Sequence, residues 1–250
     1  MTKIFLDPGH GGGDPGAVGN GLKEKDVVLS ITLKIGKILK RHNLEVLYSR
    51  TTDVFVGLSD RARKANNANA DYFISIHSNA YSDPSAQGVE TYSYPGATKA
   101  ALLSRSIQNA IISAGVYTKN RGTKTANFAV LRETKMTAVL VETAFITNSQ
   151  DANLLRYRQD DFAEAISKGI LSFLGISYIP EKLYRVQVGA FSIRANAEKL
   201  VNELKGKGYE TIIVRSGGLY KVQVGAFSVR ANAEKLVRQL KTDGYDAFIV

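Results

Sequence analysis

The sequence contains no cysteine and no tryptophan, has only five prolines in 250 residues, and lacks a long apolar run. Without cysteine, a disulfide framework, a thiolate metal site and a cysteine nucleophile are excluded, so any catalysis must use other side chains. The longest apolar segments, 138–141 and 170–174, are far shorter than the roughly 20 residues that span a bilayer. No cleavable export signal is visible after Met1, which predicts synthesis in the cytoplasm. We therefore expect a soluble globular protein that does not enter a membrane.

Acidic residues are in deficit, with 23 Asp and Glu against 33 Lys and Arg, which gives a net charge of +10. Half of this excess falls in residues 181–250, which carry 12 basic and 7 acidic side chains, or +5. A dense positive charge favours a polyanionic partner, such as nucleic acid, anionic lipid or an anionic cell-wall polymer. The alternative is that a modest basic excess only keeps the chain soluble.

The end of the chain is an internal duplication. Residues 184–214 align without gaps on residues 220–250, with 22 of 31 positions identical. Each repeat has the pattern of a strand, a helix and a second strand, so the pair predicts a small α+β domain of order βαββαβ, a ribonucleoprotein-like fold with both helices on one face. One repeat is too short to bury a core alone, and the tandem is long enough.

Both repeats open with the motif VQVGAFS. With this motif, residues 184–250 resemble a sporulation-related repeat (SPOR) domain, a family that binds peptidoglycan, particularly glycan strands stripped of their stem peptides. Alternation along the strands places Gln187 and Gln223 on an exposed face, where amides hydrogen-bond to sugars. Phe191 and Phe227 are further candidate peptidoglycan contacts, since aromatic rings stack on sugars, but core packing at the strand ends is the stronger interpretation for these two.

Residues 1–175 alternate strands and helices, which predicts an α/β fold: a mostly parallel twisted sheet with helices on both faces. Strands are expected at residues 3–7, 45–49, 72–77, 89–94 and 138–142, and helices at 24–42, 58–69, 97–114 and about 160–174. His42 ends the first helix among basic residues and is interpreted as solvated. Residues 176–183 are expected to be a short linker between the two domains.

Four ionisable residues are expected to meet at the carboxyl ends of the strands, where α/β sheets build their sites. His10 follows the first strand, His77 and Glu142 end later strands, and Glu24 opens the first helix directly after the glycine-rich loop. Two imidazoles and one carboxylate suit a zinc site that leaves a second carboxylate free as a base. A core histidine is the alternative for His77. Asp7 is expected either to share in this chemistry or to cap the glycine-rich turn.

Six segments of this region, in order, resemble the zinc-dependent N-acetylmuramoyl-L-alanine amidases. They are residues 5–16 (FLDPGHGGGDPG), 24–29 (EKDVVL), 49–53 (SRTTD), 70–80 (ADYFISIHSNA), 128–132 (FAVLR) and 140–148 (LVETAFITN). The resemblance implies a peptidoglycan hydrolase that cuts the amide between the lactyl group of muramic acid and L-alanine. It further implies that His10, Glu24 and His77 bind one Zn²⁺ per chain, and that Glu142 is the catalytic acid and base.

Other contacts and partners are expected on weaker grounds. Asn127, Arg132 and Arg63 are candidate substrate-binding residues, for which surface or helix-packing roles are equal alternatives. Expected partners are peptidoglycan and anionic wall polymers, with no nucleic acid and no membrane, and the chain is expected to be a monomer. The domain combination resembles the mother-cell lytic amidases of spore-forming bacteria or prophage endolysins, which act at the wall after secretion or cell lysis.

Two other classes of function stay open from the sequence. Glu24 and Glu142 have the residue types of a glycosidase carboxylate pair, which would make the protein a metal-independent muramidase. The basic tail and its ribonucleoprotein-like topology suggest nucleic-acid binding, but the RNA-binding consensus of that fold is missing from both repeats.

Overall fold

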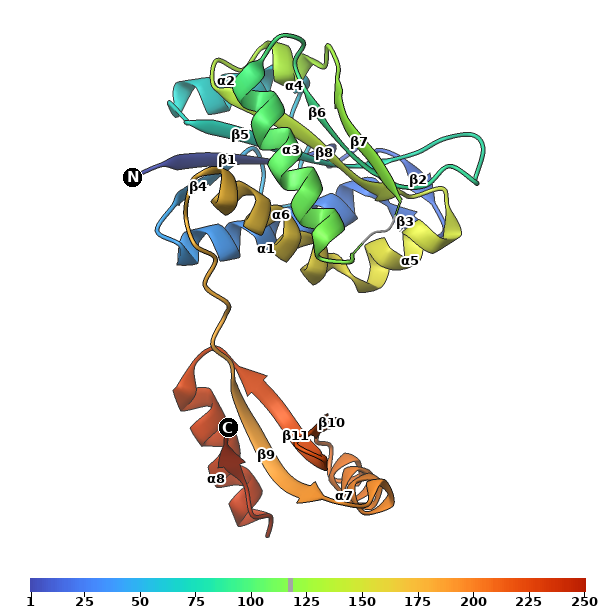
Figure 1. Ribbon diagram of the computed structural model, residues 1–250, viewed down its shortest axis with the longest axis vertical. Helices are drawn as coiled ribbons and strands as arrows, with labels where there is room; N and C mark the ends of the chain where they lie inside the picture. Colours follow the sequence, from blue (N-terminus) through green and yellow to red (C-terminus); the bar gives the residue numbers. More distant parts are fainter. Residues whose placement is uncertain (117–118) are drawn as a thin grey trace. The chain divides into compact units, whose positions relative to one another are not determined.

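The computed structural model describes residues 1–116 and 119–250, and it divides into two compact units (Figure 1). The N-terminal unit comprises Met1–Tyr178 and the C-terminal unit Ile179–Val250. Ile176 and Tyr178, expected in the linker, instead pack against the core of the N-terminal unit. The boundary between the two units therefore lies after Tyr178.

The N-terminal unit is built on a six-stranded sheet. In the order β4-β1-β5-β8-β6-β7, its strands are Glu45–Tyr48, Lys3–Pro8, Tyr72–Asn79, Thr137–Phe145, Val89–Ser93 and Asn120–Thr125. Four of the five strand pairings are parallel, and only β6 runs antiparallel to its neighbour β8. The predicted fold class, a mostly parallel sheet flanked by helices, is confirmed.

Helices cover the two faces of this sheet unequally (Figure 1). One face packs against α1 (Glu24–Arg41), α3 (Thr98–Ser113) and α6 (Gln159–Phe173), and the other against only α2 (Leu58–Asn67) and the single turn α4 (Ala129–Arg132). The apolar stripe of α1 forms this contact because its members recur at helical spacing and are buried: Val27, Val28, Ile31, Ile35 and Leu39. The small helices leave part of their face uncovered near the carboxyl ends of β1, β5 and β8.

Strand alternation decides which side chains reach the partly covered face. On β5, Ile74 and Ile76 belong to the core under the large helices, whereas Phe73 belongs to the core under α2 and α4. Ser75 and His77 share the side of Phe73, since they lie two and four residues after it on the same strand. His77 therefore points to the face of the sheet that α2 and α4 cover only in part.

Several elements of this unit were not predicted. They are the hairpin β2 (Val18–Gly19) and β3 (Leu22–Lys23), the edge strand β7, and the helix α5 (Ser149–Tyr157). The interpretation of His42 as solvated is wrong: it is 7% exposed, its Nδ1 donates to the Ile38 carbonyl oxygen at 2.8 Å, and its ring stacks on Tyr178. Among the described residues, no helix combines the length and apolar character needed to cross a membrane.

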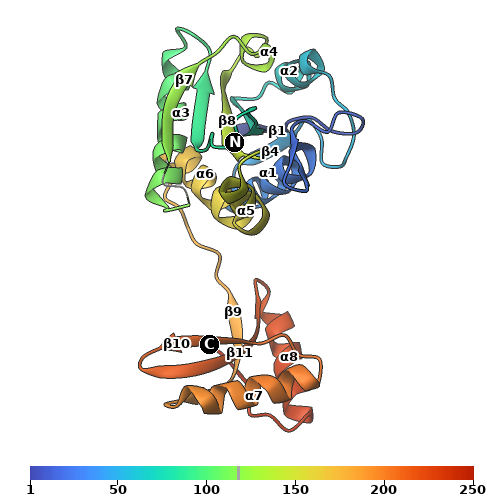
Figure 2. The same cartoon turned by 90° about the vertical axis from the view of Figure 1, so that its right-hand side faces the viewer.

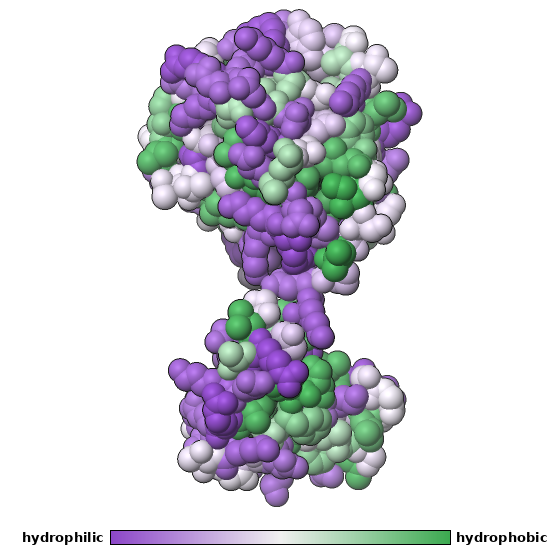
Figure 3. Space-filling view, turned by 90° about the vertical axis from the view of Figure 1, so that its left-hand side faces the viewer, coloured by the Kyte–Doolittle hydropathy of each residue, from purple (hydrophilic) through white to green (hydrophobic). Residues whose placement is uncertain are grey.

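The C-terminal unit has the predicted order βαββαβ. Its elements are β9 (Tyr184–Phe191), α7 (Arg194–Gly206), β10 (Ile212–Ser216), β11 (Leu219–Phe227), α8 (Arg230–Thr242) and β12 (Phe248–Ile249). The strands form an antiparallel sheet of order β10-β11-β9-β12, and both helices lie on one side of it (Figure 2). The other side of this sheet carries no helix. On the surface of each unit, apolar side chains are interspersed among hydrophilic ones (Figure 3).

The register of the tail corrects one expectation about its glutamines. Gln187 and Gln223 face each other across β9 and β11 on the helix-free side, but they are only 5% and 8% exposed, so the exposed position predicted for them is wrong. Each lies on a central strand, beside the large side chain of Phe248 or Ile212 on the neighbouring edge strand. Phe191 and Phe227 pack against the core on the helix side, in line with the core interpretation.

Candidate metal centre and active site

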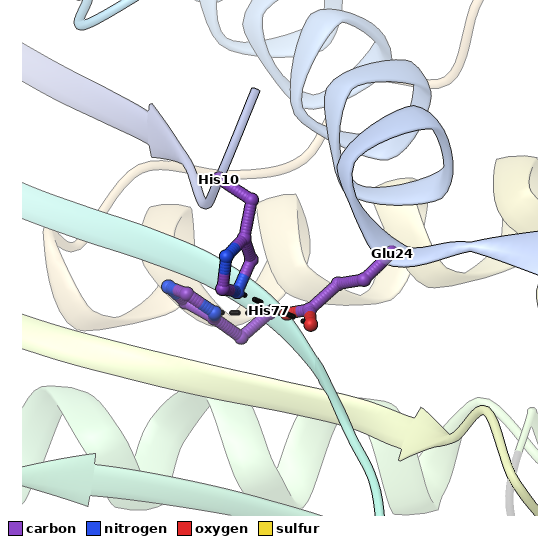
Figure 4. A group of neighbouring side chains, drawn as sticks. All are labelled: His10, Glu24 and His77. Carbon is purple, nitrogen blue, oxygen red and sulfur yellow. Dashed lines mark hydrogen bonds and ion pairs between the residues drawn. The ribbon is translucent and has the colours of Figure 1, made fainter. Parts of the chain in front are cut away.

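Three side chains from distant parts of the sequence converge at the open end of the sheet (Figure 4). His10 lies in the loop after β1, Glu24 is the first residue of α1, and His77 lies near the end of β5. The Nε2 atom of His10 is 3.2 Å from Oε2 of Glu24, and the Nδ1 atom of His77 is 2.9 Å from Oε1. One ligand atom from each residue lies within 4.8 Å of the others, which is the spacing of a metal-binding cluster.

The Glu24 carboxylate is held by its neighbours as well as by the two histidines. Oε2 accepts the Ala17 amide at 2.9 Å, and Oε1 accepts the Ser78 amide at 3.0 Å. Its position at the start of α1 also favours a negative charge, because the amino end of a helix is positive. The carboxylate is therefore fixed and ionised although it is only 3% exposed.

Asp14 orients the first of the two imidazoles. Its Oδ2 atom lies 2.8 Å from Nδ1 of His10, and its Oδ1 accepts the amide of Gly16 at 3.0 Å. A carboxylate on one ring nitrogen fixes the ring and directs the other nitrogen, here Nε2, toward Glu24, as in the outer shell of many metal sites. Asp14 was not singled out from the sequence, although its position four residues after His10 was visible.

The pKa shifts of His10, Glu24 and His77 show that positive charge is favoured beside the Glu24 carboxylate. Hydrogen bonding to Glu24 raises the pKa of His10 to about 9. Burial acts against ionisation of both Glu24 and His77, but several interactions together outweigh it. Hydrogen bonds and charge attraction from His10 and His77 lower the pKa of Glu24, and the hydrogen bond to Glu24, with the charges of Glu142 and Glu24, raises the pKa of His77. In the protein without a metal, a proton on His10 offsets the charge of the buried carboxylate. A divalent cation coordinated by two neutral imidazoles and one carboxylate would meet the same demand, so this donor set suits Zn²⁺.

Glu142 lies beside this cluster on β8, paired in register with His77 on one side and with Glu90 on the other. Its Oε2 atom is buried and has no hydrogen-bond partner among the residues that the structure describes. Burial raises the pKa of Glu142 to about 7. A carboxylate with one uncommitted oxygen and a pKa near neutrality is suited to accept and return a proton.

His10, Asp14, His77 and Glu142 line one cavity of about 530 Å³. Its polar end holds His10, His77 and Glu142, and its walls include the exposed apolar side chains of Phe55 and Phe128. Phe55 is 63% exposed and Phe128 39%, so both present apolar surface at the mouth of this cavity, where a ligand could contact it. The arrangement resembles an enzyme site with a reactive polar end and apolar contacts for the remainder of the substrate.

Comparison with known proteins agrees with this geometry. The profile of the N-acetylmuramoyl-L-alanine amidase family matches residues 4–172, and that of the SPOR domain matches residues 180–250. The chain belongs to the N-acetylmuramoyl-L-alanine amidase family. Its membership gives the reaction: hydrolysis of the amide that joins N-acetylmuramic acid to L-alanine in peptidoglycan.

Relatives cover both units or the first alone. A sporulation-specific N-acetylmuramoyl-L-alanine amidase of Bacillus subtilis (strain 168) is 42% identical over 221 residues, which are 86% of this chain and 85% of that protein. The endolysin of Bacillus phage SPP1 is 43% identical over 187 residues, 70% of this chain and 68% of that protein. Among solved structures, the amidase AmiC2 of Nostoc punctiforme is 40% identical, with a TM-score of 0.66 over 70% of this chain and 97% of that chain.

The amidase has a second buried carboxylate at the site, which sequence analysis missed. Glu90 on β6 is 2% exposed and accepts hydrogen bonds from Asn79 at 2.7 Å, Tyr92 at 2.9 Å, Arg121 at 2.8 Å and Lys124. These donors offset its charge, so a second carboxylate is tolerated next to Glu142. A glutamate inside the predicted strand 89–94 was the signal, but its partners on β7 depend on a pairing between strands that are distant in sequence.

The remaining candidates lie at other places in the amidase. Arg132 donates to Oδ1 of Asn127 at 2.8 Å, and Arg63 pairs with Asp60 on the outer side of α2. None of the three candidate substrate residues is among the described residues that line the cavity. Asp7 is fully buried, and its carboxylate accepts hydrogen bonds from the side chains of Ser49, Ser75 and Arg61. It is therefore the central acceptor of a buried network under the His10 loop and not a turn cap.

Proposed function

We propose that the protein is a zinc-dependent amidase in which His10, Glu24 and His77 hold one Zn²⁺ and Glu142 transfers protons. The observation that carries this proposal is that two imidazoles and the buried carboxylate of Glu24 bring three ligand atoms together. Beside them lies a second carboxylate, that of Glu142, with an oxygen that has no partner among the described residues. Three protein ligands leave a position open for water or substrate, as in catalytic zinc sites.

The reaction then follows from the positions of these groups. When bound, Zn²⁺ polarises the scissile carbonyl and lowers the pKa of the attacking water. Glu142 accepts a proton from that water through Oε2 and returns a proton to the amine nitrogen of L-alanine as the bond to the lactyl carbonyl breaks. A pKa near 7 lets the same carboxyl group act as base and then as acid. Glu24 cannot share this task as a glycosidase acid, because both of its oxygens are held by histidines and backbone amides.

The apolar walls hold the part of the substrate that does not react. Phe55 and Phe128 offer surface for the methyl groups of the lactyl and alanyl units and keep water away from the reacting amide. Asn127 and Arg132 flank Phe128 in sequence and are proposed to contact the substrate outside the cavity. Arg63 stays a weaker candidate, since Asp60 already holds its guanidinium.

The C-terminal unit is proposed to bind the wall polymer through the helix-free side of its sheet. Gln187 and Gln223 lie side by side there, and Phe191 and Phe227 support the strands from the other side. Tethering raises the local concentration of substrate without changing the active site. Similarity over both units to a sporulation-specific amidase supports action at the cell wall during sporulation. A role in lysis of the mother cell is a further part of the proposal.

Mass analysis of digested peptidoglycan, with and without a chelator, tests the reaction and its metal. We expect new free amino groups on L-alanine, no new reducing sugar ends, and loss of both activity and amine release when the metal is removed. A muramidase would release reducing ends and be indifferent to the chelator.

Metal content tests the ligand set. The purified protein is expected to contain about one zinc per chain, and His10→Ala, Glu24→Ala and His77→Ala are each expected to lose it, because three protein ligands are the minimum for such a site. Atomic spectrometry of the folded variants provides the measurement, and Asp60→Ala, on an exposed helix turn, is the control. An active, zinc-replete His77→Ala protein would remove His77 from the site.

A further inference from the structure

The loop that carries His10 has an unfavourable backbone conformation. His10, Gly11 and Gly12 are three consecutive residues with positive φ, at 57°, 128° and 57°. Glycine adopts such angles readily, but histidine does so only when its surroundings hold it there. The imidazole that meets Glu24 therefore depends on whatever fixes this loop.

One buried arginine holds the loop from below. Arg61 of α2 is 2% exposed and donates to the carbonyl oxygens of Pro8 at 2.6 Å and His10 at 2.7 Å. It also pairs with Oδ1 of Asp7 at 2.7 Å and donates to the Val56 carbonyl at 2.9 Å. All of these bonds run to the loop, to the strand before it, or to the segment before α2.

A second buried arginine joins the loop to the helix that carries Glu24. Arg50 is 3% exposed, and its Nη2 atom donates to the carbonyl oxygen of Gly9 at 2.7 Å and to that of Lys25 at 2.9 Å. Gly9 precedes His10 and Lys25 follows Glu24, so one nitrogen atom connects the two ligand-bearing segments. Its Nε donates to Pro8 at 3.1 Å.

The contact between Arg50 and the loop is close enough to exclude any side chain at Gly11. A Cβ atom there would lie 2.9 Å from Nε of Arg50 and 2.2 Å from the carbonyl oxygen of Val54. Three consecutive carbonyl groups, those of Pro8, Gly9 and His10, thus point at two guanidinium groups. The planar, five-donor guanidinium can hold several carbonyls at fixed angles, which a lysine ammonium cannot.

We propose that Arg50 and Arg61 are positioning residues for the metal centre: by holding these carbonyls they set the separation and direction of His10 and Glu24. Neither side chain is a metal ligand. The inference rests on the proposed metal site, and it assigns to these two arginines a role in metal affinity that is separable from their part in the stability of the fold.

The test measures metal binding by the full chain, for wild type and for Arg50→Lys and Arg61→Lys. Competition with a chromophoric chelator gives the Zn²⁺ affinity, and the visible absorption of bound Co²⁺ reports the coordination geometry. We expect each variant to bind Zn²⁺ about 10- to 100-fold more weakly, the range for residues that orient metal ligands, with an altered Co²⁺ spectrum.

Two controls separate positioning from stability. Arg63→Lys makes the same change two residues away on α2, at a side chain 69% exposed, and should leave metal affinity unchanged. Ser75→Ala removes a 2.8 Å bond to Asp7 in the same buried network without touching the loop carbonyls. It should lower the unfolding midpoint while keeping Zn²⁺ affinity within about twofold of wild type, since a buried hydrogen bond contributes to stability wherever it lies.

The Zn²⁺ affinities and unfolding midpoints of the variants either support or overturn the positioning role. Lysine variants that are less stable but bind Zn²⁺ as tightly as wild type would overturn the proposal. If a lysine variant does not fold, the glutamine variant at the same position, which keeps an amide donor, replaces it. If neither variant folds, the arginine is needed for the fold itself, and the proposal is overturned. A wild-type protein that binds neither Zn²⁺ nor Co²⁺ would instead contradict the proposed function.

Discussion

The two units differ in what they bury. The N-terminal unit buries charged side chains around its open end: Asp7, Glu24, Arg50, Arg61 and Glu90. The C-terminal unit, all of which the structure describes, buries no charged residue, and its buried polar side chains are Gln187 and Gln223. A buried charge is costly unless several partners compensate it, so it persists where chemistry requires a fixed charge out of water.

This difference indicates how the two units work. In the N-terminal unit, the charged groups that support the site, Glu24, Arg50, Arg61 and Glu90, each have partners from two or more segments, which fixes the geometry before substrate arrives. In the C-terminal unit, the two repeats create a core from apolar side chains, and their charges stay at the surface. Catalysis should therefore respond steeply to single substitutions, and wall binding only weakly.

The largest effect is expected for Glu142→Gln. The amide cannot accept a proton, so turnover of muramyl peptides should fall about 100- to 10,000-fold, the range of general acid and base catalysis. Because the substitution is nearly isosteric and Glu142 is not a proposed ligand, zinc content, unfolding midpoint and sedimentation with peptidoglycan should match wild type. Loss of zinc in this variant would instead make Glu142 a ligand.

Removal of the C-terminal unit should have a smaller effect that depends on the substrate. A chain ending at Tyr178 keeps the complete core and all residues of the site, so hydrolysis of small soluble muramyl peptides should be unchanged. On intact walls it should be about 10- to 100-fold slower, because tethering is lost. Initial rates on both substrates provide the test, and equal rates of the two proteins on walls would contradict the targeting role.

The isolated C-terminal unit, residues 179–250, tests wall binding in the absence of the catalytic unit. It should fold alone, since it has its own core, and should sediment with purified peptidoglycan. Repetition at high salt separates sugar contacts from attraction to anionic wall polymers, which salt screens.

Much of the site was predictable because its members occupy ordinary positions of an α/β sheet. His10, His77 and Glu142 follow or end strands, and Glu24 starts a helix, so topology alone brings them to one edge. What the sequence could not supply was the support around them. Glu90 meets Arg121 and Lys124 only because β6 turns antiparallel to β8 and pairs with β7, and such long-range pairing leaves no local pattern.

Two errors have a related physical origin. His42 looks solvated among Lys40 and Arg41, yet it is covered by Tyr178, which is distant in sequence. Gln187 follows the alternation of an exposed strand residue, but its neighbours on the edge strands cover it. In both places a local pattern gave the wrong burial because the covering group comes from elsewhere in the chain.

The next smaller effect is a change in pH dependence. Burial raises the pKa of Glu142 to about 7, and the negative charges of Glu24 and Glu90 contribute to this increase while His77 opposes it. The base form is lost as pH falls, so kcat/KM should decline about tenfold per pH unit below that pKa. The decline should begin well above the pH expected for an exposed glutamate.

Glu90→Gln should move this acid limb to lower pH. The substitution removes a negative charge beside Glu142 and releases Arg121 and Lys124, and both changes favour the ionised form of Glu142. Glu133→Gln, which alters a glutamate paired with Arg132, should not move the limb. An unchanged or raised acid limb in Glu90→Gln would show that Glu142 does not set it.

The smallest effect is expected at the binding face of the tail. Gln187 and Gln223 lie opposite each other across β9 and β11, so a polymer that contacts one also reaches the other. Each Gln→Ala change should weaken wall binding by the isolated C-terminal unit only about twofold to fivefold, the contribution of one neutral hydrogen bond, and the double variant should lose more. Binding isotherms at high salt provide the measurement, with unfolding midpoints to check that these buried side chains are not needed for folding. Gln239→Ala, on the exposed side of α8, is the matched control, and single variants that bind like this control would exclude the glutamine pair from the glycan-binding face.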